Sequence, residues 1–324
     1  MQSFGFVDYV SYLTEDQRGK IVDACLRNFI IWLVVFNENS LSTPCRLVFN
    51  ASRGTKDGTS LNSLLAKGIN SMNRLLDIEL RWMTHKHAFH TDISKMYNRV
   101  HLEEEHWRYQ LYLWSDGLDE SSQPRWKVIK THIYGVVSSG NIAECALRRV
   151  AEINKLAYPR AFSAITHDTY VDDCKSGTGS PNETLEVMDE IDSCMATGGF
   201  STKGYVVSGE DPPKELTKDG RSVPCGGTKW FTNGDFVKLN INLNFNRKFR
   251  GRRSKENADV IPEDLTMEDC ASIVAGIFDL PGRAAPIVAG LKADISILHK
   301  RHLDWKDPIP AEQRDIWVSN FGLI

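Results

Sequence analysis

The stretch Thr-His-Asp-Thr-Tyr-Val-Asp-Asp-Cys-Lys, residues 166–175, decides the expected fold. Asp172 and Asp173 stand here among β-branched and aromatic residues, which predicts two short strands joined at the acids. Carboxylates beside a core are costly unless they are paired or bind a cation. Taken alone, an Asp-Asp pair is also typical of a simple tight turn.

A second acid, Asp92, lies in a similar apolar stretch 80 residues before Asp172. Two such segments side by side in one sheet would bring Asp92 and Asp172 together, where repulsion favours a divalent metal between them. Two metals about 4 Å apart can activate an attacking hydroxyl and stabilise a leaving pyrophosphate. The pattern therefore predicts phosphoryl transfer.

The other periodicities predict an α+β core with a helical appendage. The segment 16–33 is expected to be a helix leading into a strand, and Gly68 is the weak point of a helix over 61–83. Asn182 is placed to cap a helix over 181–196 and Gly198-Gly199 to stop it, and Asn233-Gly234 to turn a hairpin over 226–243. Further strands are expected at 45–50, 107–114 and 126–134, and further helices at 142–156, 267–278 and 286–298.

Composition limits the class of protein. The chain has 324 residues, 41% of them hydrophobic, which excludes disorder as the main state. A net charge of −3 means that nucleic-acid binding would need a local basic face. The longest wholly apolar run, 29–36, is far shorter than a membrane span of about 20 residues. We expect an intracellular, cytoplasmic protein without membrane contact, since no secretory signal stands at the N-terminus.

Cysteine and histidine spacing gives little sign of a zinc or redox site. The seven cysteines are scattered without a Cys-x-x-Cys pair, so we expect reduced thiols. His85, His87 and His90 have ligand-like spacing, but alternate residues of a strand point to opposite faces. A solvated entry to a strand is the preferred interpretation of these histidines.

Several motifs in order resemble the reverse transcriptases, most closely those of BEL/Pao-class long-terminal-repeat retrotransposons. Tyr170 to Asp173 resembles polymerase motif C, and Asp92 with Tyr97 resembles motif A. The resemblance covers about 43–310. Its other parts are a fingers strand at 44–52, motif B at 134–144, motif D at 198–200, a primer hairpin at 226–230, and a region beyond the palm at 277–305.

The resemblance implies a right-hand polymerase with an antiparallel sheet. Partial fingers would span 1–91, the palm with interspersed fingers elements 92–245, and a helical thumb- or connection-like region 246–324. The implied activity is RNA-directed DNA polymerisation. Two Mg²⁺ (or Mn²⁺) ions would add deoxynucleoside triphosphates to a primer on an RNA or DNA template.

The resemblance also implies residue roles. Asp92, Asp172 and Asp173 would be the catalytic metal ligands. Arg46 would clamp the triphosphate, and Tyr97 would exclude a ribose 2′-hydroxyl; a surface arginine and a core tyrosine are the plain alternatives. Gly135 would let the backbone approach the nucleotide, and Lys203 could protonate pyrophosphate. Primer and template contacts would come from Tyr170, Val171, Gly227, Trp230, Arg247 and Lys248, although the basic stretch at 247–255 could equally be a solvated loop.

Departures from the family pattern leave two classes of function open. Motif B lacks the usual Ser-Ser-Pro turn at Gly140, and Lys175 stands where an apolar residue is common, which we interpret as drift. The chain is either a polymerase core or a decayed relic that keeps only the fold and nucleic-acid binding. We find no residues resembling the protease, RNase H or integrase sites of a pol polyprotein, so these partner domains are expected to be absent from this chain.

Overall fold

The computed structural model describes residues 1–36, 43–117, 122–217, 219–225, 228–239, 241, 243–247, 260–277, 279 and 282–322. The chain forms two compact units, Met1–Gly220 and Arg221–Ile324. Every ladder between the named strands is antiparallel, which confirms an α+β fold with antiparallel sheets. The expected functional division at 91/92 and 245/246 stays a prediction, because the units reflect packing alone.

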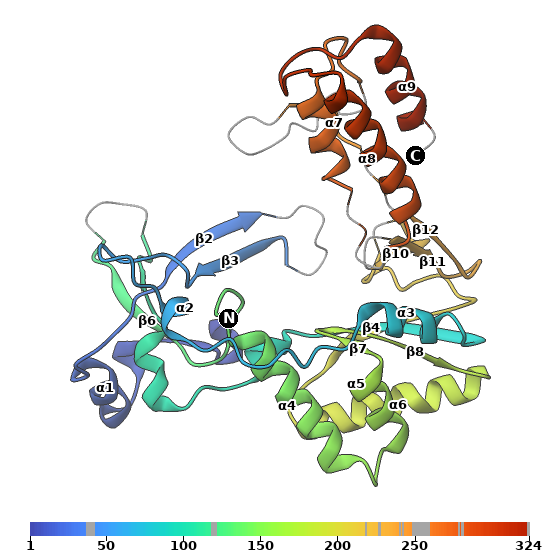
Figure 1. The fold of residues 1–324 in the computed structure, drawn as a ribbon. Helices are drawn as coiled ribbons and strands as arrows, with labels where there is room; N and C mark the ends of the chain where they lie inside the picture. The colour runs from blue at the N-terminus through green and yellow to red at the C-terminus, as the bar shows by residue number, and fades with distance from the viewer. Residues whose placement is uncertain are drawn as a thin grey trace. The chain divides into compact units, whose positions relative to one another are not determined.

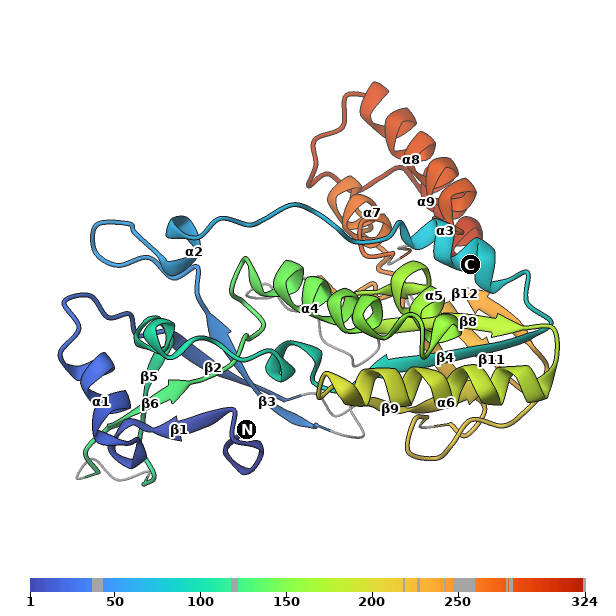
Figure 2. The same ribbon diagram turned by 90° about the horizontal axis from the view of Figure 1, so that it is seen from below.

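A four-stranded sheet in the order β7-β8-β4-β9 is the centre of the first unit (Figure 1). The acidic stretch forms two strands as predicted. Helices α4, α5 and α6 cover one face of this sheet, and α3 lies on the other, as Figures 1 and 2 show. The bounds are β4 His87–Ile93, β7 Thr169–Tyr170, β8 Asp173–Thr178, β9 Thr202–Val207, α3 Leu75–Trp82, α4 Ser139–Asn154, α5 Pro159–His167 and α6 Pro181–Thr197.

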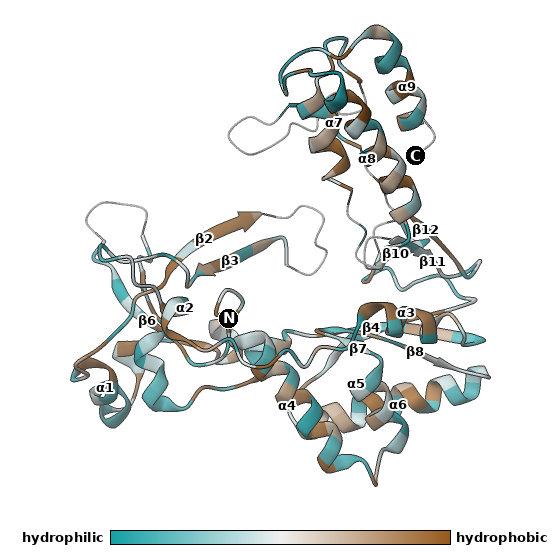
Figure 3. Ribbon diagram, viewed as in Figure 1, coloured by the Kyte–Doolittle hydropathy of each residue, from teal (hydrophilic) through white to brown (hydrophobic). Residues whose placement is uncertain are grey.

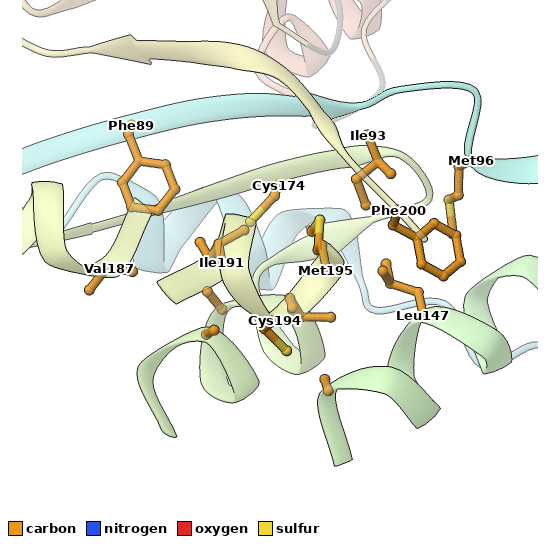
Figure 4. Close-up of a cluster of buried hydrophobic side chains, with 14 of the residues drawn as sticks. Phe89, Ile93, Met96, Leu147, Cys174, Val187, Ile191, Cys194, Met195 and Phe200 are labelled. Atoms are coloured by element: carbon orange, nitrogen blue, oxygen red, sulfur yellow. The ribbon is translucent and has the colours of Figure 1, made fainter. Parts of the chain in front are cut away.

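The core between this sheet and its helices follows from the period-two pattern of β4. Phe89 and Ile93 point to the helices and are almost fully buried. They pack in one cluster with Leu147 of α4 and with Ile191 and Met195 of α6 (Figure 4). Each such side chain contributes about 1.5–3 kcal/mol by leaving water. The alternate positions of β4, including Asp92, therefore lie on the opposite face of the sheet.

A second sheet and a two-stranded ribbon complete the first unit. The sheet has the order β1-β6-β5, and the ribbon pairs β2 with β3. In Figure 3 the ribbon strand β2 is strongly apolar, yet Phe36 at its end is 76% exposed. The bounds are β1 Val7–Tyr9, β2 Ile31–Phe36, β3 Cys45–Asn50, β5 Leu111–Trp114 and β6 Arg125–Ile129, with short 3-10 helices at Gln2–Phe4, Val10–Tyr12, Met96–Arg99 and Glu104–Tyr109.

Two expected elements are interrupted. The helix predicted over 61–83 is two helices, α2 Leu61–Leu64 and α3, because the intervening segment bonds to α4. The Ser71 hydroxyl donates to the Glu144 carboxylate of α4. Gly68 has a φ of +85°, and a Cβ at this position would lie 2.2 Å from the Asn141 side chain of α4. The strand predicted over 107–114 begins only at Leu111, because residues before it form a 3-10 helix that buries Trp107.

Helix ends differ from the expectation in two places. The first helix, α1 Glu15–Val22, ends well before 33, and Thr14 caps its start. The cap of α6 is Ser180, whose hydroxyl accepts from Glu183 N, so Asn182 lies inside the helix and is not its cap. The stop at Gly198-Gly199 is confirmed, since Gly199 adopts a φ of +75° that favours glycine.

The second unit combines a three-stranded sheet with three helices. The predicted hairpin is confirmed between β11 and β12, and the helical tail forms a core around Trp317 and Leu298. No described helix is long and apolar enough to cross a membrane. The bounds are β10 Ser222–Cys225, β11 Thr228–Phe231, β12 Phe236–Leu239, α7 Met267–Val274, α8 Ala285–Lys300 and α9 Ala311–Gly322.

Candidate active site

The two acidic segments predicted to be neighbours lie side by side. In the β4–β8 ladder Asp92 pairs with Asp173, and Ile93 N donates to the carbonyl of Asp172 at 2.7 Å. Val171, at the turn between β7 and β8, has a φ of +56°, which is strained for a β-branched residue. Such strain persists only where the surroundings determine the conformation, and it often accompanies a functional site.

Burial and mutual repulsion disfavour the charged forms of two of the acids. Burial, then repulsion from Asp92 and Asp173, raises the pKa of Asp172 to about 6. Burial also raises the pKa of Asp92, with repulsion from Asp173 acting in the same direction and Lys203 opposing it. A raised pKa means that the charged form of a carboxylate is destabilised. A cation bound between such carboxylates would stabilise their charged forms.

The third acid has a different environment. Burial acts to raise the pKa of Asp173, but the hydrogen bond from His90 and the attraction of His90, Lys175 and Lys203 hold it below its ordinary value. His90 Nε2 lies 3.1 Å from Asp173 Oδ1. His90 is thus a partner of an acid, and in the part of the chain that the structure describes it forms no metal cluster with His85 and His87.

Lys203 is directed at Asp92 by an irregularity in β9. The register between β4 and β9 shifts between Thr91 and Ile93, and Gly204, with a φ of +113°, occupies the bulge. A bulge redirects the adjacent side chain. Lys203 Nζ consequently lies 2.6 Å from Asp92 Oδ1, so the lysine expected near the site does lie beside a catalytic-type acid.

The donor set fits divalent magnesium or manganese. Asp92 Oδ1 is buried, and the Lys203 ammonium lies 2.6 Å from it. Within the described residues no group of three or more His, Cys, Asp or Glu side chains is arranged to hold an ion. Magnesium ordinarily binds through one or two carboxylates together with substrate phosphates and water, so Asp92 and Asp172 match that requirement.

Two tyrosines stand beside the acids. Tyr97 follows β4, and its ring centroid lies 4.0 Å from that of Tyr134, a residue of the turn before α4. Burial, then the charge of Asp172, raises the pKa of Tyr97. Burial is the largest cause that raises the pKa of Tyr134. The charges of Asp172 and Asp92 raise this pKa further, and the charge of Arg46 lowers it.

The turn that carries Tyr134 is closely fixed. Gly135 has a φ of +101°, and a Cβ there would lie 2.2 Å from the carbonyl oxygen of Phe49 in β3. The Asn62 side chain donates to the Gly135 carbonyl at 2.8 Å and accepts from Val137 N at 2.9 Å. Glycine is therefore required at 135 so that the turn can lie against the backbone of β3.

Arg46 lies on β3 as predicted, in an exposed position. Its Nε donates to the carbonyl of Thr43 at 3.3 Å, and its charge acts on Tyr134. Tyr170 ends β7 and Val171 forms the turn, so both stand immediately before the acids. The structure thus places Arg46, Tyr97, Gly135 and Lys203 in the same unit as the three acids.

Lys175 has a structural role that its interpretation as drift did not foresee. Its side chain is 2% exposed and forms an ion pair with Glu79 of α3, which is equally buried. A charged residue at this position is tolerated because the opposing helix supplies the opposite charge.

The second unit contains the remaining residues expected at primer or template. Trp230 is 1% exposed and donates to Asp235, so its indole stabilises the sheet and offers no surface to a primer. Arg247 is bound by the carboxylates of Asp264 and Asp269 at 3.0 Å each, so it anchors the start of α7. Its side chain is still half exposed, and its expected contact with primer or template stays a prediction. Gly227 and Lys248, like the rest of the basic stretch to 255, lie outside the described residues.

Sequence reasoning assigned no role to three residues of the site. The sequence pattern groups His90 only with the other two histidines. It places Tyr134 only in the turn at 134–144 and Asn62 only in the helical segment at 61–83. Tyr134 carried a usable signal, because it directly precedes a glycine in the segment that resembles motif B. The partner of His90 could not be found, because it depends on strand register.

Comparison with known proteins gives two findings. Residues 266–321 match the family model described as the Pao retrotransposon-like RNaseH-like domain. The fold is similar to a solved structure of a foamy viral protease-reverse transcriptase, dRH, in complex with double-stranded DNA, with a TM-score of 0.59 and 13% identity. That match covers 99% of this chain and 45% of the other, so the chain spans less than half of its length. No curated protein sequence matches significantly.

The family match corrects one expectation. We expected no segment related to RNase H, whereas 266–321 match a domain described as RNaseH-like. The described residues of that segment form α7, α8 and α9 and no named strand. The segment 266–321 is thus similar to a domain of Pao retrotransposons, and the chain has a mixed fold built on antiparallel sheets that is similar to the fold of the foamy viral protein.

Proposed function

We propose that the chain is the core of an RNA-directed DNA polymerase that adds deoxynucleotides to a primer. The observation that carries the proposal is the meeting of Asp92 with Asp172 and Asp173, although 80 residues separate Asp92 from Asp172 in the sequence. Asp92 pairs with Asp173 across neighbouring strands, and the backbone N–H of Ile93 donates to the carbonyl of Asp172. The raised pKa values of Asp92 and Asp172, and the buried Oδ1 of Asp92 with a cationic Lys203 beside it, support a role in binding cations. The fold similarity to a reverse transcriptase supports the same proposal.

The residues around the acids have matching roles. Asp92 and Asp172 would hold magnesium or manganese, with Asp173 oriented by His90. When bound, the ions would supply the positive charge that assists attack by a primer hydroxyl and departure of pyrophosphate. Arg46 would bind the triphosphate through charge-assisted hydrogen bonds. Lys203 Nζ, 2.6 Å from Asp92, would move to the leaving pyrophosphate and donate its proton there.

The test is primer extension on poly(rA)–oligo(dT) with Mg²⁺ or Mn²⁺. Asp172→Asn should lower the extension rate by about 10²-fold or more, because it removes charge where the reaction develops it. Asp189→Asn is the matched control, since Asp189 is exposed on α6 in the helical layer. Magnesium should also raise the melting temperature of the wild type and not of Asp172→Asn.

Two outcomes would contradict the proposal. Extension by Asp172→Asn at the wild-type rate would remove the assignment of the metal site. A wild type that binds an RNA–DNA duplex in a salt-sensitive way but never extends it would favour the alternative, a decayed relic that retains the fold and nucleic-acid binding.

A further inference from the structure

We infer that Tyr134 is a positioning residue that holds the ring of Tyr97 and thereby sets discrimination between deoxyribonucleotides and ribonucleotides. The inference rests on the proposed polymerase function. It concerns a residue for which neither the sequence motifs nor the comparisons provide a role.

The ring contact is the first observation. The centroids of Tyr97 and Tyr134 are 4.0 Å apart with an interplanar angle of 38°, which is the closest of the aromatic contacts recorded among the described residues. Tyr134 is nevertheless 52% exposed, while Tyr97 is half-buried. A large aromatic side chain that is exposed on one side and packed on the other is suited to support its neighbour at a binding surface.

The second observation is that Tyr97 is confined from the opposite direction. A Cβ at Gly140, in the first turn of α4, would lie 3.3 Å from the Tyr97 hydroxyl. The hydroxyl therefore lies against a position with no side chain, and the ring lies against Tyr134. These two contacts restrict the ring of Tyr97 between the turn and the helix.

The turn itself is rigid enough to carry this role. Asn62 binds the backbone at Gly135 and Val137, directly after Tyr134. On the other side Asn98, the residue after Tyr97, donates to the His132 carbonyl at 3.0 Å. The segments that carry Tyr97 and Tyr134 are thus joined by a hydrogen bond next to each ring.

The charged side chains near Tyr97 and Tyr134 indicate which part of a bound nucleotide the two rings would contact. Both tyrosine hydroxyls experience the charge of Asp172, and Tyr134 also experiences Asp92 and Arg46. Tyr134 is therefore within electrostatic reach of both the acids and the arginine proposed to bind the triphosphate. A nucleotide held by both would bring its sugar to this aromatic surface, where the position of the Tyr97 ring decides whether a 2′-hydroxyl fits.

The experiment compares Tyr134→Ala with Tyr134→Phe in the full chain. Tyr134→Ala should reduce the ratio of kcat/KM for dTTP over UTP by about tenfold, while Tyr134→Phe, which keeps the ring, should retain the wild-type ratio. Gly140→Ala should also lower the ratio, because it presses on the Tyr97 hydroxyl. An unchanged ratio in Tyr134→Ala, with a lowered ratio in Tyr97→Ala, would overturn the inference and leave the proposed function intact.

A second measurement does not need turnover. In protein labelled with ¹³C at the tyrosine ring carbons, the Tyr97 signals should shift and sharpen in Tyr134→Ala and stay near the wild type in Tyr134→Phe. Tyr97→Phe identifies the signals. If the wild type extends no primer, the proposed function fails, and these spectra still decide whether Tyr134 positions Tyr97: unaltered Tyr97 signals in Tyr134→Ala would contradict it.

Discussion

Lys175 lies two residues after Asp173 and is almost completely buried. Its ammonium forms an ion pair with Glu79 of α3, and it also lies 5.7 Å from the ring centroid of Trp82. Removing two charges from water is costly, and only their close mutual attraction offsets that cost. The pair therefore links β8 to α3 and fixes the strand that begins with Asp173.

We expect each single substitution in this pair to be strongly destabilising. Lys175→Met and Glu79→Gln should each lower the free energy of unfolding by about 3–5 kcal/mol, because one buried charge would remain without its partner. The double substitution should cost much less than the sum. Chemical denaturation of the four proteins in a double-mutant cycle measures this.

The exposed pair Lys155–Glu152 is the control for this cycle. Lys155→Met should change the free energy of unfolding by less than about 1 kcal/mol, since exposed ion pairs contribute little. Additive effects of Lys175→Met and Glu79→Gln would show that the two side chains do not depend on each other.

At the scale of elements, the turn at 134–137 shows how one glycine determines a connection. Gly135 has a φ of +101°, and a Cβ there would lie 2.2 Å from the Phe49 carbonyl oxygen of β3; Gly199 after α6 has a φ of +75° with open space around it. Both positions have a positive φ, and they differ in whether a backbone atom lies where a Cβ would be. They form a matched pair for experiment.

Gly135→Ala should therefore be far more damaging than Gly199→Ala. Alanine at 199 should cost about 1–2 kcal/mol from backbone strain alone. Alanine at 135 must in addition displace β3, so we expect a larger loss of stability together with a raised KM for nucleotide. Thermal unfolding and steady-state kinetics would test this, and equal losses of stability would show that the approach to Phe49 carries no cost.

The elements themselves were largely predictable, and their irregularities were not. The strands around the acids, the hairpin at 233–234 and the helix stop at Gly198-Gly199 follow from local turn chemistry and periodicity. The break between α2 and α3 does not, because it results from hydrogen bonds to α4, which lies some 70 residues later in the chain. The bulge at Gly204 likewise depends on pairing with β4.

At the scale of the whole molecule, each unit has its own core, and Arg247 is an internal anchor of the second. It binds Asp269, which also accepts from the hydroxyl and the backbone N–H of Thr266 at the start of α7. Burial acts to raise the pKa of Asp269, but the hydrogen bonds from Arg247 and Thr266 hold it below its ordinary value. Asp269 is thus stabilised in its charged form by folding.

This gives a pH dependence of defined sign for the second unit. A lowered pKa in the folded state means that Asp269 contributes stability above its ordinary pKa near 3.8, and that this contribution is lost as the pH falls through the lower, folded value. Asp269→Asn should remove that part of the acid sensitivity. Hydrogen exchange of α7–α9 between pH 6 and pH 3 would measure it.

Asp315→Asn, at an exposed position of α9, is the control and should keep the wild-type profile. If Asp269→Asn and the wild type lose protection in parallel as the pH falls, the anchor between Arg247 and Asp269 does not contribute to the acid sensitivity of this unit.

The sequence by itself determined the features that depend on short-range physics. Alternating apolar residues, turn-forming acids and glycines defined the strand that carries Asp92 and the turn that carries Asp172, and charge repulsion implied what their meeting would require. Only the tertiary structure decided the partners: Lys203 with Asp92, His90 with Asp173, Glu79 with Lys175, Tyr134 with Tyr97, and Asp269 with Arg247. Such pairings depend on strand register and on packing between distant segments, which no local pattern encodes.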